Sequence, residues 1–117
     1  MTPAARYQTG KAAEEHVARL YAREGCSILA RRWRGPAGEL DLVVQQGEEV
    51  IFVEVKASRD FSQAAMHLTT RQIQRIYASA AHFLGFMAEG QRTPTRFDVA
   101  LVDRTGRVNR IANAIGI

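Results

Sequence analysis

The sequence predicts a single α/β domain, spanning residues 1–117, in which a mixed central sheet is covered by helices on both faces. Two segments have the apolar period of amphipathic helices, and several long strands rich in Val, Ile, Leu and Phe lie between and after them. The predicted order is α-β-β-β-α-β-β. No repeat, low-complexity tract or linker divides the 117 residues, a usual length for one domain.

The first helix is predicted over residues 6–24, with Gly25 as its stop signal. At about 100° per residue, one face carries an apolar stripe of Gly10, Ala13, Val17, Leu20 and Tyr21. Glu14 lies at the edge of this stripe, whereas Glu15 points nearly opposite. We therefore expect Glu14 to lean over the surface on which the helix packs, and Glu15 to face solvent.

Three strands are predicted next, over residues 27–33, 38–45 and 49–57. The first has the weakest pattern, and a Gly35-Pro36 turn follows it. The second and third are strongly apolar and are separated by Gly47, which indicates a β-hairpin.

A long loop is predicted over residues 58–67, followed by a second helix with Thr69 or Thr70 as its N-cap. This helix is expected to continue to Gly90, because a helical period is kept by Ile73, Ile76, Tyr77, Ala80, Leu84 and Met87.

Two further strands are predicted at residues 96–102 and 108–111, joined by a turn at Thr105-Gly106. Asp98 falls within the first of them. We interpret Asp98 as a structural residue and expect it to pair with Arg96.

Composition narrows the classes of function. The net charge of +4 and the pI near 9.8 favour polyanionic partners. The single cysteine, Cys26, excludes an internal disulfide and a cysteine-based zinc cluster, and we expect it to be buried. No apolar run approaches the roughly 20 residues that span a membrane, and no signal peptide is recognisable, so we expect a cytoplasmic protein.

Other kinds of site find no support in the sequence. His16, His67 and His82 lack the spacing of zinc ligands. Ser58 and Ser62 belong to no Ser/His/Asp arrangement. No glycine-rich phosphate loop is present.

The hairpin carries the residues that are candidates for a catalytic or metal-binding site. If Gly47-Glu48 centres the turn, facing residues have numbers that sum to 95, so Asp41 faces Glu54 and Glu39 faces Lys56. All four then share one face of the hairpin. The opposite face is predicted to be wholly apolar and to consist of Leu40, Leu42, Val44, Ile51, Val53 and Val55.

Carboxylates facing each other about 5 Å apart on a sheet repel, and a shared Mg²⁺ or Mn²⁺ offsets that repulsion. Lys56, beside them, can orient a water or stabilise charge on phosphorus. The alternative is a solvated strand edge with an ordinary Glu39–Lys56 salt bridge. We favour the metal site, because the other face is apolar and Glu14 can approach from the helix.

Two segments of the hairpin resemble the signature of PD-(D/E)XK nucleases. Asp41 in Gly38-Glu39-Leu40-Asp41-Leu42 matches the first acid, and Glu54-Val55-Lys56 matches the (D/E)XK triplet. More narrowly, the chain is similar to the YraN family of small bacterial proteins, predicted endonucleases related to archaeal Holliday-junction resolvases. The similarity covers nearly the full length, from Thr9-Gly10 to Asn113-Ala114.

The resemblance implies a restriction-endonuclease-like αβββαβ core and a metal site. It implies that Asp41 and Glu54 hold Mg²⁺ or Mn²⁺ and that Lys56 is catalytic. It also implies a helical acid that completes the metal shell, which maps to Glu14, the residue that the helical wheel selects independently.

Two positions depart from the family's usual pattern. Ala13 stands where a glycine usually precedes the helical acid, and Gln72 stands where the second helix often opens with a lysine. A glutamine at position 72 can still bind phosphate or water.

Arginines supply candidate contacts to a nucleic-acid backbone. Arg31, Arg32 and Arg34 surround Trp33, whose indole could stack on a base. The alternative is a basic strand end with Trp33 packed on the fold. Arg59, in the predicted loop, is a further candidate for phosphate contact.

The leading hypothesis is a Mg²⁺- or Mn²⁺-dependent endonuclease acting on phosphodiester bonds of structured or branched DNA. The first alternative is a catalytically inactive nucleic-acid-binding module of the same fold, and the second is a protein-interaction domain. The resemblance to resolvases also suggests a homodimer, because a junction has two-fold symmetry, although no feature of the sequence identifies a dimer face.

Overall fold

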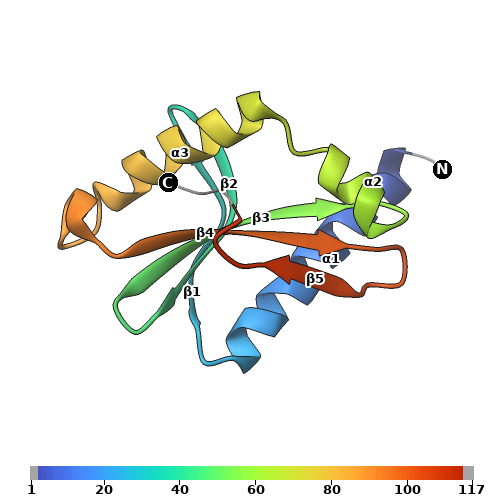
Figure 1. Cartoon of the computed structure of the whole chain (residues 1–117), viewed down its shortest axis with the longest axis horizontal. Coiled ribbons are helices and arrows are strands. Elements are labelled where there is room, and N and C mark those ends of the chain that lie inside the picture. Colours follow the sequence, from blue (N-terminus) through green and yellow to red (C-terminus); the bar gives the residue numbers. More distant parts are fainter. Residues whose placement is uncertain (1–2, 115–117) are drawn as a thin grey trace.

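The computed structural model describes residues 3–114, with side chains from Gly10 onward (Figure 1). Along this part of the chain the helices are α1 (Pro3–Arg23), α2 (Phe61–Met66), α3 (Thr70–Leu84) and the short 3-10 helix η1 (Gly90–Arg92). The strands are β1 (Ser27–Gly35), β2 (Gly38–Gln46), β3 (Glu49–Ala57), β4 (Thr95–Val102) and β5 (Val108–Ile111). None of the helices described is long and apolar enough to cross a bilayer.

The five strands form one mixed sheet in the order β1-β2-β3-β4-β5. Neighbours are antiparallel except β3 and β4, which run parallel. The parallel pair follows from the connection through α2 and α3, because a hairpin turn cannot join parallel strands. The predicted mixed sheet flanked by helices is confirmed, and its element order is compatible with an αβββαβ core.

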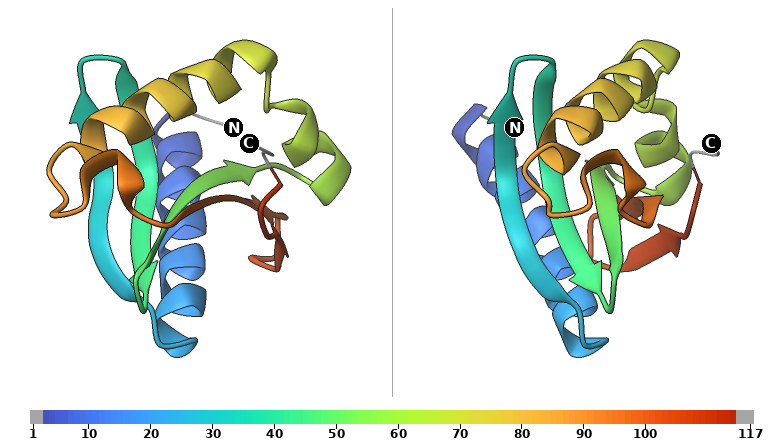
Figure 2. Two further views of the ribbon diagram at one scale, coloured as in Figure 1. Left: turned by 60° about the vertical axis from the view of Figure 1, so that its left-hand side comes forward. Right: turned by 90° about the vertical axis from the view of Figure 1, so that its left-hand side faces the viewer.

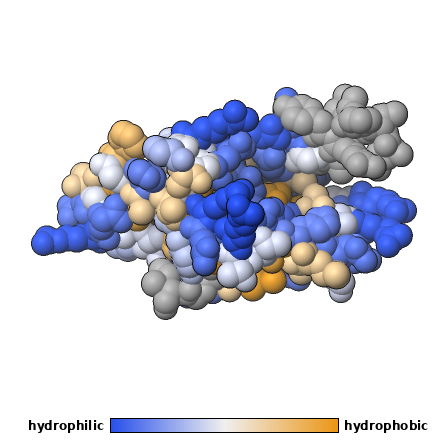
Figure 3. Space-filling view, turned by 90° about the horizontal axis from the view of Figure 1, so that it is seen from above, coloured by the Kyte–Doolittle hydropathy of each residue, from blue (hydrophilic) through white to orange (hydrophobic). Residues whose placement is uncertain are grey.

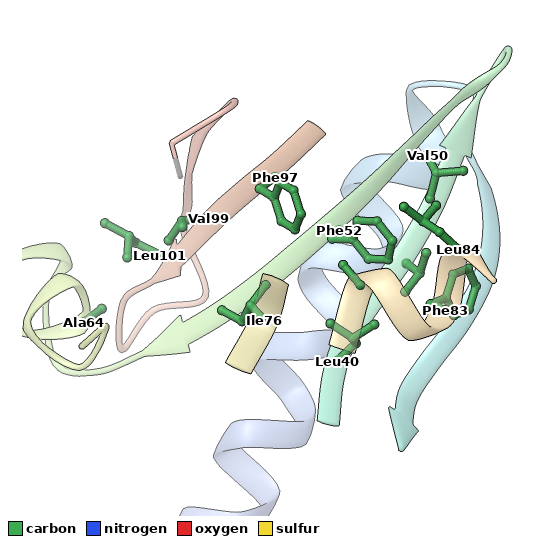
Figure 4. Close-up of a cluster of buried hydrophobic side chains, with 12 residues drawn as sticks. Leu40, Val50, Phe52, Ala64, Ile76, Phe83, Leu84, Phe97, Val99 and Leu101 are labelled. Carbon is green, nitrogen blue, oxygen red and sulfur yellow. The ribbon is translucent and has the colours of Figure 1, made fainter. Parts of the chain in front are cut away.

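Helices cover both faces of this sheet, with α1 on one side and α3 on the other (Figure 2). Beneath α1 lies a buried cluster that contains Ala13, Val17, Tyr21, Cys26, Leu42, Val44, Ile51 and Val53. Beneath α2 and α3 lies a second cluster that contains Leu40, Val43, Phe52, Ile76, Phe83 and Phe97 (Figure 4). Cys26 is thus buried, as predicted.

The region between β3 and β4 differs from the prediction in two ways. The predicted loop over residues 58–67 contains α2, because the Asp60 side chain caps it by accepting a hydrogen bond from Gln63 N at 2.8 Å. The predicted second helix is too long: α3 begins after Thr69, as expected, but ends at Leu84, with Gly85 as its C-cap, rather than at Gly90. Local apolar spacing continues past Gly85, but Phe86 is 81% exposed and packs under no helix.

A charged network lies under α1 where β4 passes it. Asp98 is fully buried and accepts hydrogen bonds from Tyr21 Oη at 2.5 Å, from Arg96 Nε at 2.9 Å and from Asn113 N at 2.9 Å. Arg96 also bonds Glu49 at 3.1 Å. The predicted pairing of Asp98 with Arg96 is confirmed, and the two side chains tie α1 and the segment after β5 to the sheet.

Ser79 offers a test of packing on the α3 face. Its Oγ is buried and has no hydrogen-bond partner within residues 3–114. Ser79→Ala should therefore raise the free energy of unfolding by about 1 kcal/mol, since it removes an unsatisfied hydroxyl and improves helix propensity. Urea denaturation measures the change, with exposed Ser62→Ala in α2 as the control. A loss of stability in Ser79→Ala would show that the hydroxyl has a partner.

Candidate functional site

The β2–β3 hairpin has the predicted register over its first half. Val43 pairs with Phe52 and Leu42 with Val53, and in both pairs the numbers sum to 95. The ladder ends there, so the predicted ladder pairs of Asp41 with Glu54 and of Glu39 with Lys56 are both absent from it. Glu39 instead accepts a hydrogen bond from Arg34 Nε at 3.1 Å, across the β1–β2 pair.

Asp41 lies at the point where β2 and β3 separate. Its Oδ2 accepts a hydrogen bond from Val55 N at 2.9 Å, so a carboxylate takes the N–H that a regular antiparallel ladder would give to a carbonyl. Beyond this point β3 continues in parallel with β4, with Glu54 beside Val99 and Lys56 beside Leu101. The site is therefore a fork between two diverging strands.

The strands next to the fork lose the regular alternation of side chains. Arg32 has a left-handed backbone with φ 48°, an uncommon conformation for a residue other than glycine. Ala30 and Trp33, three residues apart, consequently pack against the same cluster under α3. On β2, Leu40 also belongs to this cluster, whereas Leu42 packs under α1. The prediction of a single apolar face from Leu40 to Val44 is wrong at Leu40, because an irregular strand breaks the period of two.

Asp41 and Glu54 bring two carboxylates close together in the fork. Glu54 is only 8% exposed. Burial, and then the nearby Glu54 carboxylate, raise the pKa of Asp41 to about 7. The negative charges of the two acids are thus incompletely compensated by the protein itself.

Lys56 completes the predicted trio on β3. Its Nζ lies 3.0 Å from Glu54 Oε1, and its side chain is 15% exposed. Gln72, in the first turn of α3, has two uses for its amide. In one orientation its oxygen accepts from Thr69 N at 3.4 Å and completes a capping box. In the other its oxygen accepts from Lys56 Nζ at 3.2 Å, which brings Gln72 to the site.

Glu14 approaches from α1, but its carboxylate is bound by Arg32. Arg32 Nε and Nη2 donate to the two Glu14 oxygens, each at 2.8 Å. Glu14, Arg32 and Asp41 line the same cleft of about 240 Å³, together with Lys11. Among the residues described, no three His, Cys, Asp or Glu side chains converge as a ready metal site. Glu14 is therefore beside the carboxylate pair and is held by an arginine.

The remaining candidates divide between the cleft and the outer surface. Arg31 lines the cleft and forms an ion pair with Glu15 at 2.6 Å. The sequence predicted that Glu15 faces solvent, whereas its carboxylate is held by this arginine. Arg34 is 85% exposed at the end of β1. Trp33 packs edge-on against Phe83 with ring centroids 5.4 Å apart, which agrees with the alternative of a packed indole.

Comparison with known proteins assigns this chain to a family. The model of Uncharacterised protein family UPF0102 matches residues 13–102, which include all of β1 to β4. A UPF0102 protein of Ruegeria pomeroyi is 55% identical over 107 residues, covering 92% of this chain and 87% of its own. One from Cereibacter sphaeroides (strain ATCC 17029) is 54% identical over 108 residues, covering 92% of each chain. One from Dinoroseobacter shibae is 42% identical over 105 residues, covering 90% of this chain and 78% of its own. The chain is a member of the UPF0102 family.

Proposed function

We propose that the protein is a Mg²⁺- or Mn²⁺-dependent endonuclease that cleaves phosphodiester bonds in structured or branched DNA. The observation that carries this proposal is the Asp41–Glu54 pair at the strand fork, in which Asp41 is half-buried and Glu54 is buried, with Lys56 3.0 Å from Glu54. The resemblance to PD-(D/E)XK nucleases, described above, supports the same assignment. Cleavage of a two-fold symmetric junction would also call for a dimer of this chain.

The donor chemistry of the fork suits a hard divalent cation. Asp41 and Glu54 supply carboxylate oxygens, which Mg²⁺ and Mn²⁺ prefer as ligands. The raised pKa of Asp41 reports its burial first and then its repulsion by Glu54, and a bound cation would offset both. Glu14 would add a third carboxylate if Arg32 released it.

Each residue has a role that follows from its position. Asp41 and Glu54 would hold the metal, which supplies a polarised water and neutralises charge on the phosphate. Lys56 would hold the attacking water or a phosphate oxygen, because its ammonium is fixed beside Glu54. Gln72 would orient Lys56 through its amide oxygen. Arg31 and Arg34 would contact neighbouring phosphates.

Cleavage assays test the proposal directly. Purified protein is incubated with a four-way junction and with linear duplex of the same sequence in Mn²⁺. Asp41→Asn and Glu54→Gln should each lower the rate at least about 100-fold, since each removes a metal ligand without changing side-chain size. Glu48→Gln in the β2–β3 turn is the matched control and should cut at the rate of the unchanged protein. Cleavage that survives both site substitutions would reject the assignment.

A non-catalytic DNA-binding module is the second candidate, and the Glu14–Arg32 pair favours it. An arginine that already neutralises Glu14 leaves two carboxylates for a metal. This alternative predicts DNA binding that weakens with salt, no cleavage in any metal, and weak Mn²⁺ affinity in calorimetric titration. The two functions are therefore separated by metal binding as well as by cleavage.

A further inference from the structure

A cavity between α1 and the β4–β5 turn lies outside the carboxylate fork. It has a volume of about 640 Å³, within the range of small-molecule sites. Its walls come from α1, from the segment after β3, from the C-terminal side of α2, and from the β4–β5 turn. No part of the proposed cleavage mechanism uses it.

Four basic side chains from three separate parts of the chain line this cavity. Arg59 and His67 flank α2, Arg104 lies in the β4–β5 turn, and His16 lies on α1. The sequence shows no motif that connects His16 with His67, so only the fold reveals their common position. Four basic side chains around one cavity favour an anionic ligand.

One acid, Asp103, lines the same cavity, but its Oδ1 is engaged by its own turn. It accepts hydrogen bonds from Thr105 N at 2.9 Å and from Arg107 N at 3.0 Å. The turn is also attached to the opposite wall, because Arg104 N donates to Arg59 O at 3.4 Å. The two arginines therefore sit on adjoining backbone segments, a geometry that suits one shared anion.

The rest of the cavity is apolar. Small residues on α1, including Gly10 and Ala13, leave space beside Ala57 and Val102 on the sheet. A flat apolar ring can occupy such a surface, whereas a bare inorganic anion would leave it uncovered. The apolar surface suits a nucleobase, and the basic side chains suit a phosphate joined to it.

The cavity and the cleft beside the fork are both lined by residues of α1. Gly10, Ala13 and His16 line the cavity, and Lys11 and Glu14 line the cleft.

We propose that this cavity binds one unpaired nucleotide, with the base against Ala57 and Val102 and the phosphate against Arg59 and Arg104. His16 and His67 add donors to the same phosphate. The nucleotide is either part of a strand or a free nucleoside monophosphate, and both present the same chemistry. Binding needs no metal, so it is independent of whether the protein cleaves DNA.

The test is an amide chemical-shift titration of the full chain in EDTA, with dAMP, deoxyadenosine and inorganic phosphate as separate probes. We expect dAMP to shift the signals of Ala57 and Gly106 and to bind at least about tenfold more tightly than either fragment, since it makes both sets of contacts. Arg104→Gln should weaken dAMP about five- to tenfold, the loss of one charge-assisted contact. Arg92→Gln in η1 is the matched control and should bind dAMP as the unchanged protein does.

A second substitution, His67→Gln, keeps the test decisive if Arg104→Gln disturbs the fold, which signal dispersion reveals. Competition of dAMP with a labelled single-stranded oligonucleotide assigns the nucleotide to a strand; dAMP binding without competition assigns it to the free monophosphate. The proposal is overturned if phosphate binds as tightly as dAMP, if the shifts lie elsewhere, or if Arg92→Gln weakens binding equally. Because EDTA is present throughout, failure of the nuclease assay and failure of this titration are separate results.

Discussion

Asp41→Asn is expected to stabilise the metal-free protein at pH 8, although it removes a proposed metal ligand. Burial and the neighbouring Glu54 raise the pKa of Asp41 to about 7, so at pH 8 the folded protein holds a carboxylate in a place that disfavours its charge. Asparagine is neutral, and its amide oxygen can still accept from Val55 N. We expect a gain of about 2 kcal/mol in the free energy of unfolding, allowing for partial solvation of the site.

The gain should depend on pH in a defined direction. The folded-state pKa of Asp41 lies above its unfolded value, so between about pH 4 and pH 7 the folded protein binds more protons at this position than the unfolded chain. Stability of the unchanged protein therefore falls as pH rises through this window. The difference between Asp41→Asn and the unchanged protein should be small at pH 4 and largest at pH 8, measured by urea denaturation in EDTA.

Asp41→Ala provides the contrast. Alanine also removes the charge but leaves Val55 N without its acceptor, and loss of this part-buried hydrogen bond costs about 1 kcal/mol. It should therefore be less stable than Asp41→Asn at every pH. An Asp41→Asn protein that is less stable than the unchanged one at pH 8 would show that the carboxylate is well compensated in the fold.

Asp98→Asn is expected to destabilise the protein by about 3–5 kcal/mol at pH 7, because it breaks a buried ion pair on one side only. Arg96 would lose its main partner, and the fully buried position would hold an amide among donors from Tyr21 and Asn113. Glu48→Gln removes the same charge at an exposed turn and should change the free energy of unfolding by less than about 0.5 kcal/mol.

The effect of Asp98→Asn should fade in acid. Burial alone would raise the pKa of Asp98, but hydrogen bonds from Arg96, Tyr21 and Asn113 outweigh it and hold the pKa below its ordinary value. The ionised Asp98 therefore contributes stability above the unfolded pKa near 4, and that contribution is lost as pH falls through the lower folded-state pKa. Denaturation curves at pH 7 and pH 3 should show a smaller difference at pH 3. An equal difference at both would indicate that shape rather than charge accounts for the cost.

The sequence by itself determined those features of the protein that depend on local period and turn chemistry. It located the β2–β3 hairpin and its register as far as Leu42 and Val53, because Gly47 centres the turn and the apolar pattern admits one pairing. It also indicated the start of α3 through Thr69, and the pairing of Asp98 with Arg96. The Asp41, Glu54 and Lys56 trio came from the same hairpin arithmetic.

Only the tertiary structure decided how that trio is arranged, because the deciding contacts join segments far apart in the chain. Asp41 takes the N–H of Val55 where β2 separates from β3, which stays paired with β4, and this ends the β2–β3 ladder before Glu39 can face Lys56. The left-handed turn at Arg32 places that arginine on Glu14.

For the same reason, the sequence did not predict the cavity lined by Arg59 and Arg104. Its basic wall joins α1, the segments around α2 and the β4–β5 turn, and strand and helix periods carry no information about which distant segments meet. His16 and His67 are therefore far apart in the sequence but line the same cavity in the fold. Local sequence pattern specified the helices, the strands and the acidic residues. The packing of α1 on the sheet and the separation of β2 from β3 specified the sites that these residues form.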